Sequence, residues 1–123
     1  MVLPFAADRF RETSVTDVPG EWGPHFDDVR ASVESAGDLV IPPAPADEPS
    51  DDAAYRRVVD ALFDEALALA RVEYGDATPA HQVLAVVIWD GVVRGADDMS
   101  AVFIDEARRR GIAVEQIRTL DGE

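Results

Sequence analysis

Apolar residues along this chain follow patterns typical of strands and of helices, and the clearest example lies near its carboxyl end. Seven consecutive apolar residues at 83–89 have strand length and predict a strand buried on both faces, as in the middle of a parallel sheet. A helical pattern follows and ends at Gly111; its inward positions are Met99, Val102, Phe103 and Ala107. Residues 113–117 then predict a second strand, which completes a βαβ unit.

The pattern upstream predicts further helices and strands. Short strands are expected at 2–5 and 39–41, one or two helical turns at 7–13, and longer helices from Pro24 to a cap at Gly37 and from Ser50 or Asp51 to about Gly75. Residues 42–52 hold four prolines and four acidic residues and predict a surface loop. The alternation predicts one α/β domain over 1–123, a three-layer Rossmann-like parallel sheet of about four strands flanked by helices.

Charge and composition exclude several classes of partner. The formal net charge is -14, and all eleven basic residues are arginines. Nucleic acid and anionic membranes are therefore not expected as partners, because both need a basic surface. The chain has no cysteine, no secretory leader and no apolar run of about 20 residues, so we expect a cytoplasmic protein without disulfides.

The loop between the two carboxyl-terminal strands is the best candidate for a ligand site, because it follows the carboxyl end of a parallel strand and precedes a helix. Its candidate ligand-binding residues are Trp89, Asp90, Gly91, Gly95, Asp97, Asp98 and Ser100. Glycines allow a ligand close to the backbone, carboxylates accept hydrogen bonds from ribose hydroxyls, and an indole stacks on a base.

A purely structural interpretation of the same residues stays open. Gly91 and Gly95 are typical of turns, Asp97, Asp98 or Ser100 is a suitable helix cap, and Trp89 is suited to closing a core. Neither GxGxxG nor GxxxxGK[ST] is present, so sugar or base contacts are expected here rather than phosphate contacts.

Catalytic and metal-binding patterns are missing from the sequence. The histidines, His25 and His81, lie far apart and outside any recognised ligand spacing, and the serines lack a GxSxG context. We therefore predict no catalytic residue, no metal and no cofactor.

Three segments of the chain resemble SLOG-type Rossmann-like domains, which occur in bacterial signalling and conflict proteins, often beside tetratricopeptide repeats. These segments are LPFAADRFRETSV with GEWGPHFDDV, the helix AYRRVVDALFDEALALA, and VVIWDGVVRGADDMSAVFIDEARRRGIAVEQI. Trp89, Asp90, Gly91, Gly95, Asp98 and Ser100 match the family's pattern, whereas Asp97 replaces a usual glycine. The resemblance implies a nucleotide-ligand sensor.

The resemblance also implies that the central first strand of the sheet, beside residues 83–89, is not represented. An internal start in a longer reading frame, a separate chain supplying the strand, or closing up of the remaining strands with homodimerisation would each resolve this. The expected function is a non-catalytic nucleotide-ligand-sensor-like binding domain, truncated or split, that binds a nucleotide-derived small molecule weakly or not at all alone.

Two alternatives remain. One is an acidic interaction protein that completes or binds a partner chain. The other is a nucleotide N-glycosidase of the lysine-decarboxylase-like phosphoribohydrolase group, whose PGGxGT-type motif is replaced here by RGADDMS, with Glu106 late on the helix.

Overall fold

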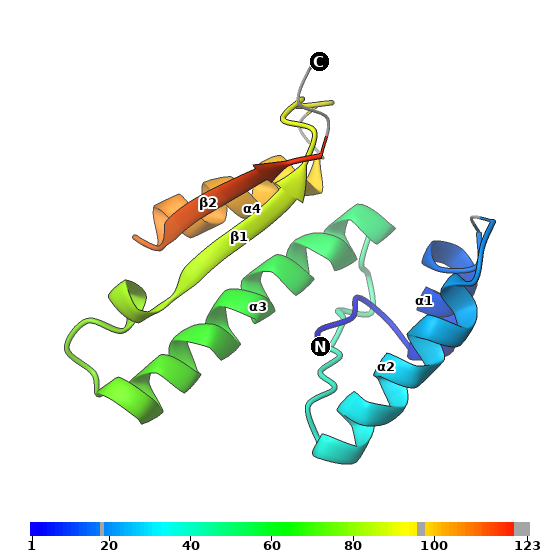
Figure 1. The fold of residues 1–123 in the computed structure, drawn as a ribbon, viewed down its shortest axis with the longest axis horizontal. Helices are drawn as coiled ribbons and strands as arrows, with labels where there is room; N and C mark the ends of the chain where they lie inside the picture. Colours follow the sequence, from blue (N-terminus) through cyan, green and yellow to red (C-terminus); the bar gives the residue numbers. More distant parts are fainter. Residues whose placement is uncertain (18, 96–97, 120–123) are drawn as a thin grey trace. The chain divides into compact units, whose positions relative to one another are not determined.

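The computed structural model describes residues 1–123 except 18, 96–97 and 120–123, and it confirms the α/β class (Figure 1). The helices are α1 (Ala7–Ser14), α2 (Trp22–Ala36), α3 (Asp51–Tyr74) and α4 (Met99–Arg109), with a short 3-10 turn at Pro79–Gln82. The strands are β1 (Leu84–Trp89) and β2 (Ala113–Arg118). The chain divides into two compact units, 1–58 and 59–123.

Unit 1–58 has an aromatic core and only a trace of sheet. The Phe5 ring meets Tyr55 edge-on with centroids 6.0 Å apart, and Phe10 lies between Phe5 and Phe26. Of the strands predicted at 2–5 and 39–41, the described residues form a single parallel bridge between Val2 and Val40. Pro4 and Pro42 limit both segments, because proline has no N–H to donate to a ladder.

The helix boundaries in this unit follow local chemistry. α2 begins at Trp22, two residues before the predicted start, since Pro24 is tolerated in a first turn where N–H groups have no intrahelical partner. Gly37 ends α2 as predicted, with φ 75° in the left-handed region. Ser50 caps α3: its hydroxyl accepts a hydrogen bond from the Ala53 N–H at 3.3 Å.

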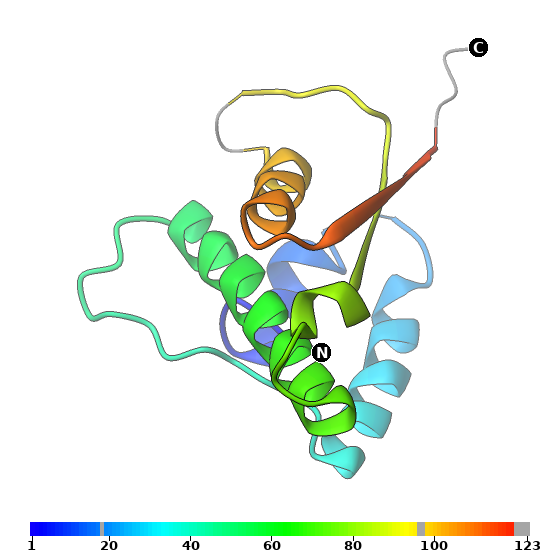
Figure 2. The same cartoon turned by 90° about the vertical axis from the view of Figure 1, so that its left-hand side faces the viewer.

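Unit 59–123 contains the predicted βαβ unit. β1 and β2 are parallel and in continuous register, from Leu84 opposite Ala113 to Trp89 opposite Arg118. α4 connects them and lies along one face of the pair, which Figure 2 shows from the side. The core beneath is made by α3, α4 and β1; its buried members are Val59, Phe63, Ala85, Ala107 and Ile112.

The prediction that β1 is buried on both faces is wrong for this chain. Ala85 and Val87 are buried under the helices, whereas Leu84, Val86 and Ile88 are 55, 45 and 65% exposed. Ile117, opposite Ile88 on β2, is 48% exposed. The strand has the composition of a doubly covered strand, but α3 and α4 pack on only one of its faces. We call Leu84, Val86, Ile88 and Ile117 the open face.

Candidate functional site

The loop from β1 to α4 is held by two carboxylates. Asp90 accepts a hydrogen bond from the Val92 N–H at 3.0 Å and forms a salt bridge with the Arg94 guanidinium. Asp98 is the N-cap of α4: its Oδ1 accepts from the N–H groups of Ser100 at 3.0 Å and Ala101 at 3.3 Å. Its Oδ2 accepts from the Arg94 N–H at 3.0 Å. Both carboxylates therefore have structural partners.

The other predicted loop residues also have local roles. Gly91 and Gly95 have φ values of 84° and 120°, which favour glycine, and a Cβ at Gly91 would come within 2.9 Å of the Arg118 guanidinium. Ser100 contributes its backbone N–H to the cap. Asp97 lies outside the described residues. The structure thus places Asp90, Gly95 and Asp98 in one loop and Ser100 in the first turn of α4, and turn and cap formation account for the contacts given above.

Trp89 lies at the carboxyl end of β1, half-buried, and its indole N–H donates to the Gln116 Oε1 at 3.0 Å. It lines a cavity of about 140 Å³ together with residues of α4 and β2, including Ile104 and Arg108. Pockets for drug-sized ligands usually enclose roughly 300–1,000 Å³. The described part of this site is therefore small for a whole nucleotide.

Arg94 lowers the pKa of Asp90 to about 2, mainly through its hydrogen bonds to the carboxylate and secondarily through the Val92 N–H. Because the folded pKa lies below the ordinary value of 3.8, the loop contacts are fully present above about pH 4 and are lost as the pH falls through about 2. Arg94→Gln is expected to raise the pKa of Asp90. A carboxyl-carbon NMR titration measures both values; an unchanged pKa in the variant would contradict the assignment of this salt bridge.

Asp98→Ala is expected to destabilise α4 by about 0.5–2 kcal/mol, since the cap accepts from two helical N–H groups. Asp98→Asn is the matched control, because asparagine caps helices about as well as aspartate. Urea unfolding followed by circular dichroism measures both. Equal losses in the two variants would show that charge, rather than capping, gives Asp98 its effect.

A second charged cluster, which the sequence patterns did not predict, joins α3 to the end of α4. The Arg110 Nε lies 2.6 Å from the Glu106 Oε2, and its Nη1 lies 2.8 Å from the Asp64 Oδ1. The guanidinium carbon of Arg110 lies 5.6 Å from the centre of the Phe63 ring. Arg109 and Arg110 lower the pKa of Glu106 to about 2 by hydrogen bonding. Glu106 is thus held as a paired anion at the end of α4. Its spacing of four residues from Arg110 was the available signal.

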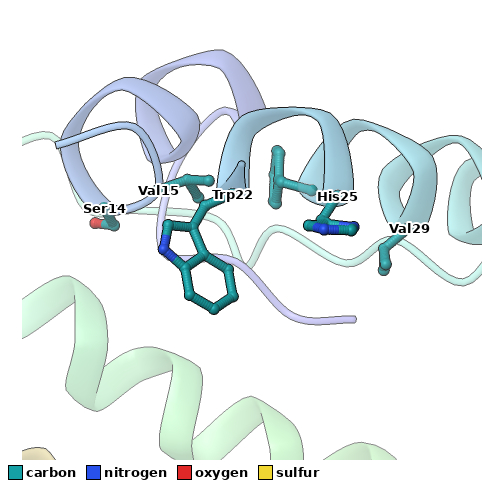
Figure 3. A pocket seen from close by; sticks show the side chains of 6 residues that line it. Ser14, Val15, Trp22, His25 and Val29 are labelled. Carbon is teal, nitrogen blue, oxygen red and sulfur yellow. The ribbon is translucent and has the colours of Figure 1, made fainter. Parts of the chain in front are cut away.

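A third feature is an apolar pocket in unit 1–58. It has a volume of about 420 Å³ and is lined by Ser14, Val15, Trp22, His25, Phe26 and Val29. Figure 3 shows Trp22, His25 and Val29 projecting from the same side of α2. Trp22 is 55% exposed. This row was not singled out from the sequence; the helical spacing of Trp22, Phe26 and Val29 was the available signal.

Comparisons with protein-family models, curated proteins and solved structures find no match to this chain. Within the described ranges, no three histidine, cysteine, aspartate or glutamate side chains are grouped to hold a metal ion. None of the described helices combines the length and apolar character needed to cross a membrane.

Proposed function

We propose that residues 59–123 act as an acidic interaction module whose small sheet is completed by a strand from a partner polypeptide. The observation that carries this proposal is the open face of β1, a strand with six apolar residues of which three are about half or more exposed. Exposed apolar rows of this kind mark interaction surfaces in soluble proteins.

The free edge of β1 supports the same function. Among the described residues β1 pairs only with β2, so its other edge presents unpaired N–H and C=O groups. Natural edge strands are usually protected by charged residues, prolines or bulges, and β1 (LAVVIW) contains no charge and no proline. β2, in contrast, carries Glu115, Gln116 and Arg118. The composition therefore favours β2 as an outer strand and β1 as an inner strand of the completed sheet.

A second copy of this chain satisfies these surfaces less well than a different partner. A copy related by a two-fold axis either extends the sheet edge to edge, leaving both open faces uncovered, or stacks face to face, leaving both edges unpaired. Each copy also carries a charge of -14, which opposes self-association. A partner with a basic surface is attracted by the same charge.

Photo-cross-linking tests this function in the cells that produce the protein. Benzoylphenylalanine replaces Ile88 on the open face or, as a matched control, the exposed Asp105 on α4, which covers the opposite face. We expect adducts from position 88 to one segment of a different polypeptide, uncharged over about six residues, with few from position 105. Val86→Arg, introduced beside the label, is expected to abolish them.

Two outcomes of this experiment would overturn the proposal. Equal adduct formation at positions 88 and 105 would mean that contacts are non-specific. Adducts from position 88 to a second copy alone would make the face a self-association surface.

Nucleotide-ligand sensing is a second candidate, favoured by one specific observation: a loop at the carboxyl end of a parallel strand leads into the N-terminus of α4. Under this proposal the module is a SLOG-type, Rossmann-like sensor whose ligand cleft needs the partner strand. We expect the chain alone to bind nucleotides weakly or not at all. Micromolar binding of a nucleotide to this chain in isothermal titration would contradict that dependence.

A further inference from the structure

From the geometry of β1 we infer which kind of strand completes the sheet. The partner contributes a strand that pairs in parallel with the free edge of β1. This strand begins a right-handed βαβ unit that extends away from β1, and the helix of that unit covers the open face. This inference rests on the proposed function and specifies the partner of the same surface.

The composition of β1 indicates the direction of the missing neighbour. Antiparallel strands usually alternate apolar and polar residues because one of their faces meets water. β1 has six apolar residues without interruption, as strands do that lie between parallel neighbours with helices on both faces. Its existing neighbour β2 is parallel and is joined through α4. A parallel strand on the free edge extends the same arrangement.

Handedness places the partner's helix. Connections between parallel strands of one sheet are right-handed in about 98% of cases. The unit β1–α4–β2 runs to one side of β1 with its helix on the covered face. A right-handed unit that starts beside β1 and runs to the opposite side therefore has its helix on the other face. That face is the open one, which carries Leu84, Val86, Ile88 and Ile117.

The length of β1 indicates how long this helix is. A six-residue strand spans about 20 Å, which matches a helix of roughly 13 residues. We expect this helix to have one apolar stripe toward the open face and basic residues on its outer side, in keeping with the charge of -14.

A synthetic peptide tests the direction. The probe has an uncharged Thr/Val strand of six residues, a glycine turn and an amphipathic helix with outward arginines, with a nitroxide label at the strand's amino end or at the turn. In the NMR spectrum of the full chain, the amino-end label is expected to broaden the Leu84 amide. The turn label is expected to broaden the amides of Trp89 and Thr119, which follow the direction of β1.

Each result decides the inference. The reversed broadening pattern would mean that the peptide strand pairs antiparallel to β1, and it would overturn this inference. The proposed function would then still be decided by the cross-linking experiment. No broadening at about 1 mM peptide would overturn the inference as well.

A strand-only peptide is expected to bind at least about tenfold more weakly, a loss of about 1.4 kcal/mol. Equal affinity would show that the helix does not cover the open face. Ile88→Arg is the control variant, and it is expected to remove binding of both peptides.

Discussion

Val87→Asp is expected to destabilise residues 59–123 by about 3–5 kcal/mol, whereas Val86→Asp changes their stability by less than about 1 kcal/mol. The two residues are neighbours of the same type on the same strand, but they face opposite sides. Val87 is 7% exposed beneath the helices, so a carboxylate there is buried without a partner. Val86 is 45% exposed on the open face, where a carboxylate stays hydrated.

Urea unfolding of the two variants and the parent chain, followed by far-UV circular dichroism, measures this difference. The comparison needs no partner and no ligand. If both aspartates destabilise the chain equally, then the open face is covered in the isolated protein, and it is not available to a partner strand.

Phe63→Ala is expected to destabilise the same unit by about 3–5 kcal/mol, the usual range for removing a buried phenylalanine. The ring is 3% exposed and stacks on Phe103 with centroids 4.9 Å apart. It also lies beneath the Arg110 guanidinium, so its removal takes a contact from the cluster that joins α3 to α4. The expected loss therefore combines a cavity, an aromatic pair and a weakened charged contact.

Leu62→Ala is the matched control for Phe63→Ala. Leu62 precedes Phe63 on α3 and is 38% exposed, so its truncation is expected to cost about 1 kcal/mol or less. Thermal and urea unfolding of both variants provide the test. A loss at Phe63 no larger than the loss at Leu62 would contradict the assignment of α3 to this core.

The elements predicted best from sequence are those with strong local signals. Gly37 and Gly75 end their helices with positive φ, and Asp98, one of three residues suited to cap α4, accepts hydrogen bonds from its first N–H groups. The strand, helix and strand patterns at 83–117 predicted a parallel βαβ unit, and the parallel pairing of β1 with β2 confirms it. The strands at 2–5 and 39–41 were expected to be short because Pro4 interrupts the first and Pro42 follows the second, and the described residues form only one bridge there.

The candidate site shows where sequence patterns stop being informative. Asp90 and Asp98 were predicted correctly to lie in one loop, since both follow β1 within a short distance. Their partners Arg94 and the α4 N–H groups depend on the loop's conformation, which the pattern does not specify. The exposure of Leu84, Val86 and Ile88 could not be predicted from the sequence either, because an apolar run indicates a preference for burial but not which element covers it.

Hydrogen exchange of the β1 amides measures whether the free edge of β1 is available to a partner strand. In a strand with one neighbour, every second N–H points toward the free edge and is not bonded in the sheet. For the isolated chain we therefore predict alternation along Leu84–Trp89, with amides bonded to β2 protected and the intervening ones exchanging rapidly. Uniform protection of all six amides would mean that the edge of β1 is already occupied, and β1 could not then pair with a partner strand.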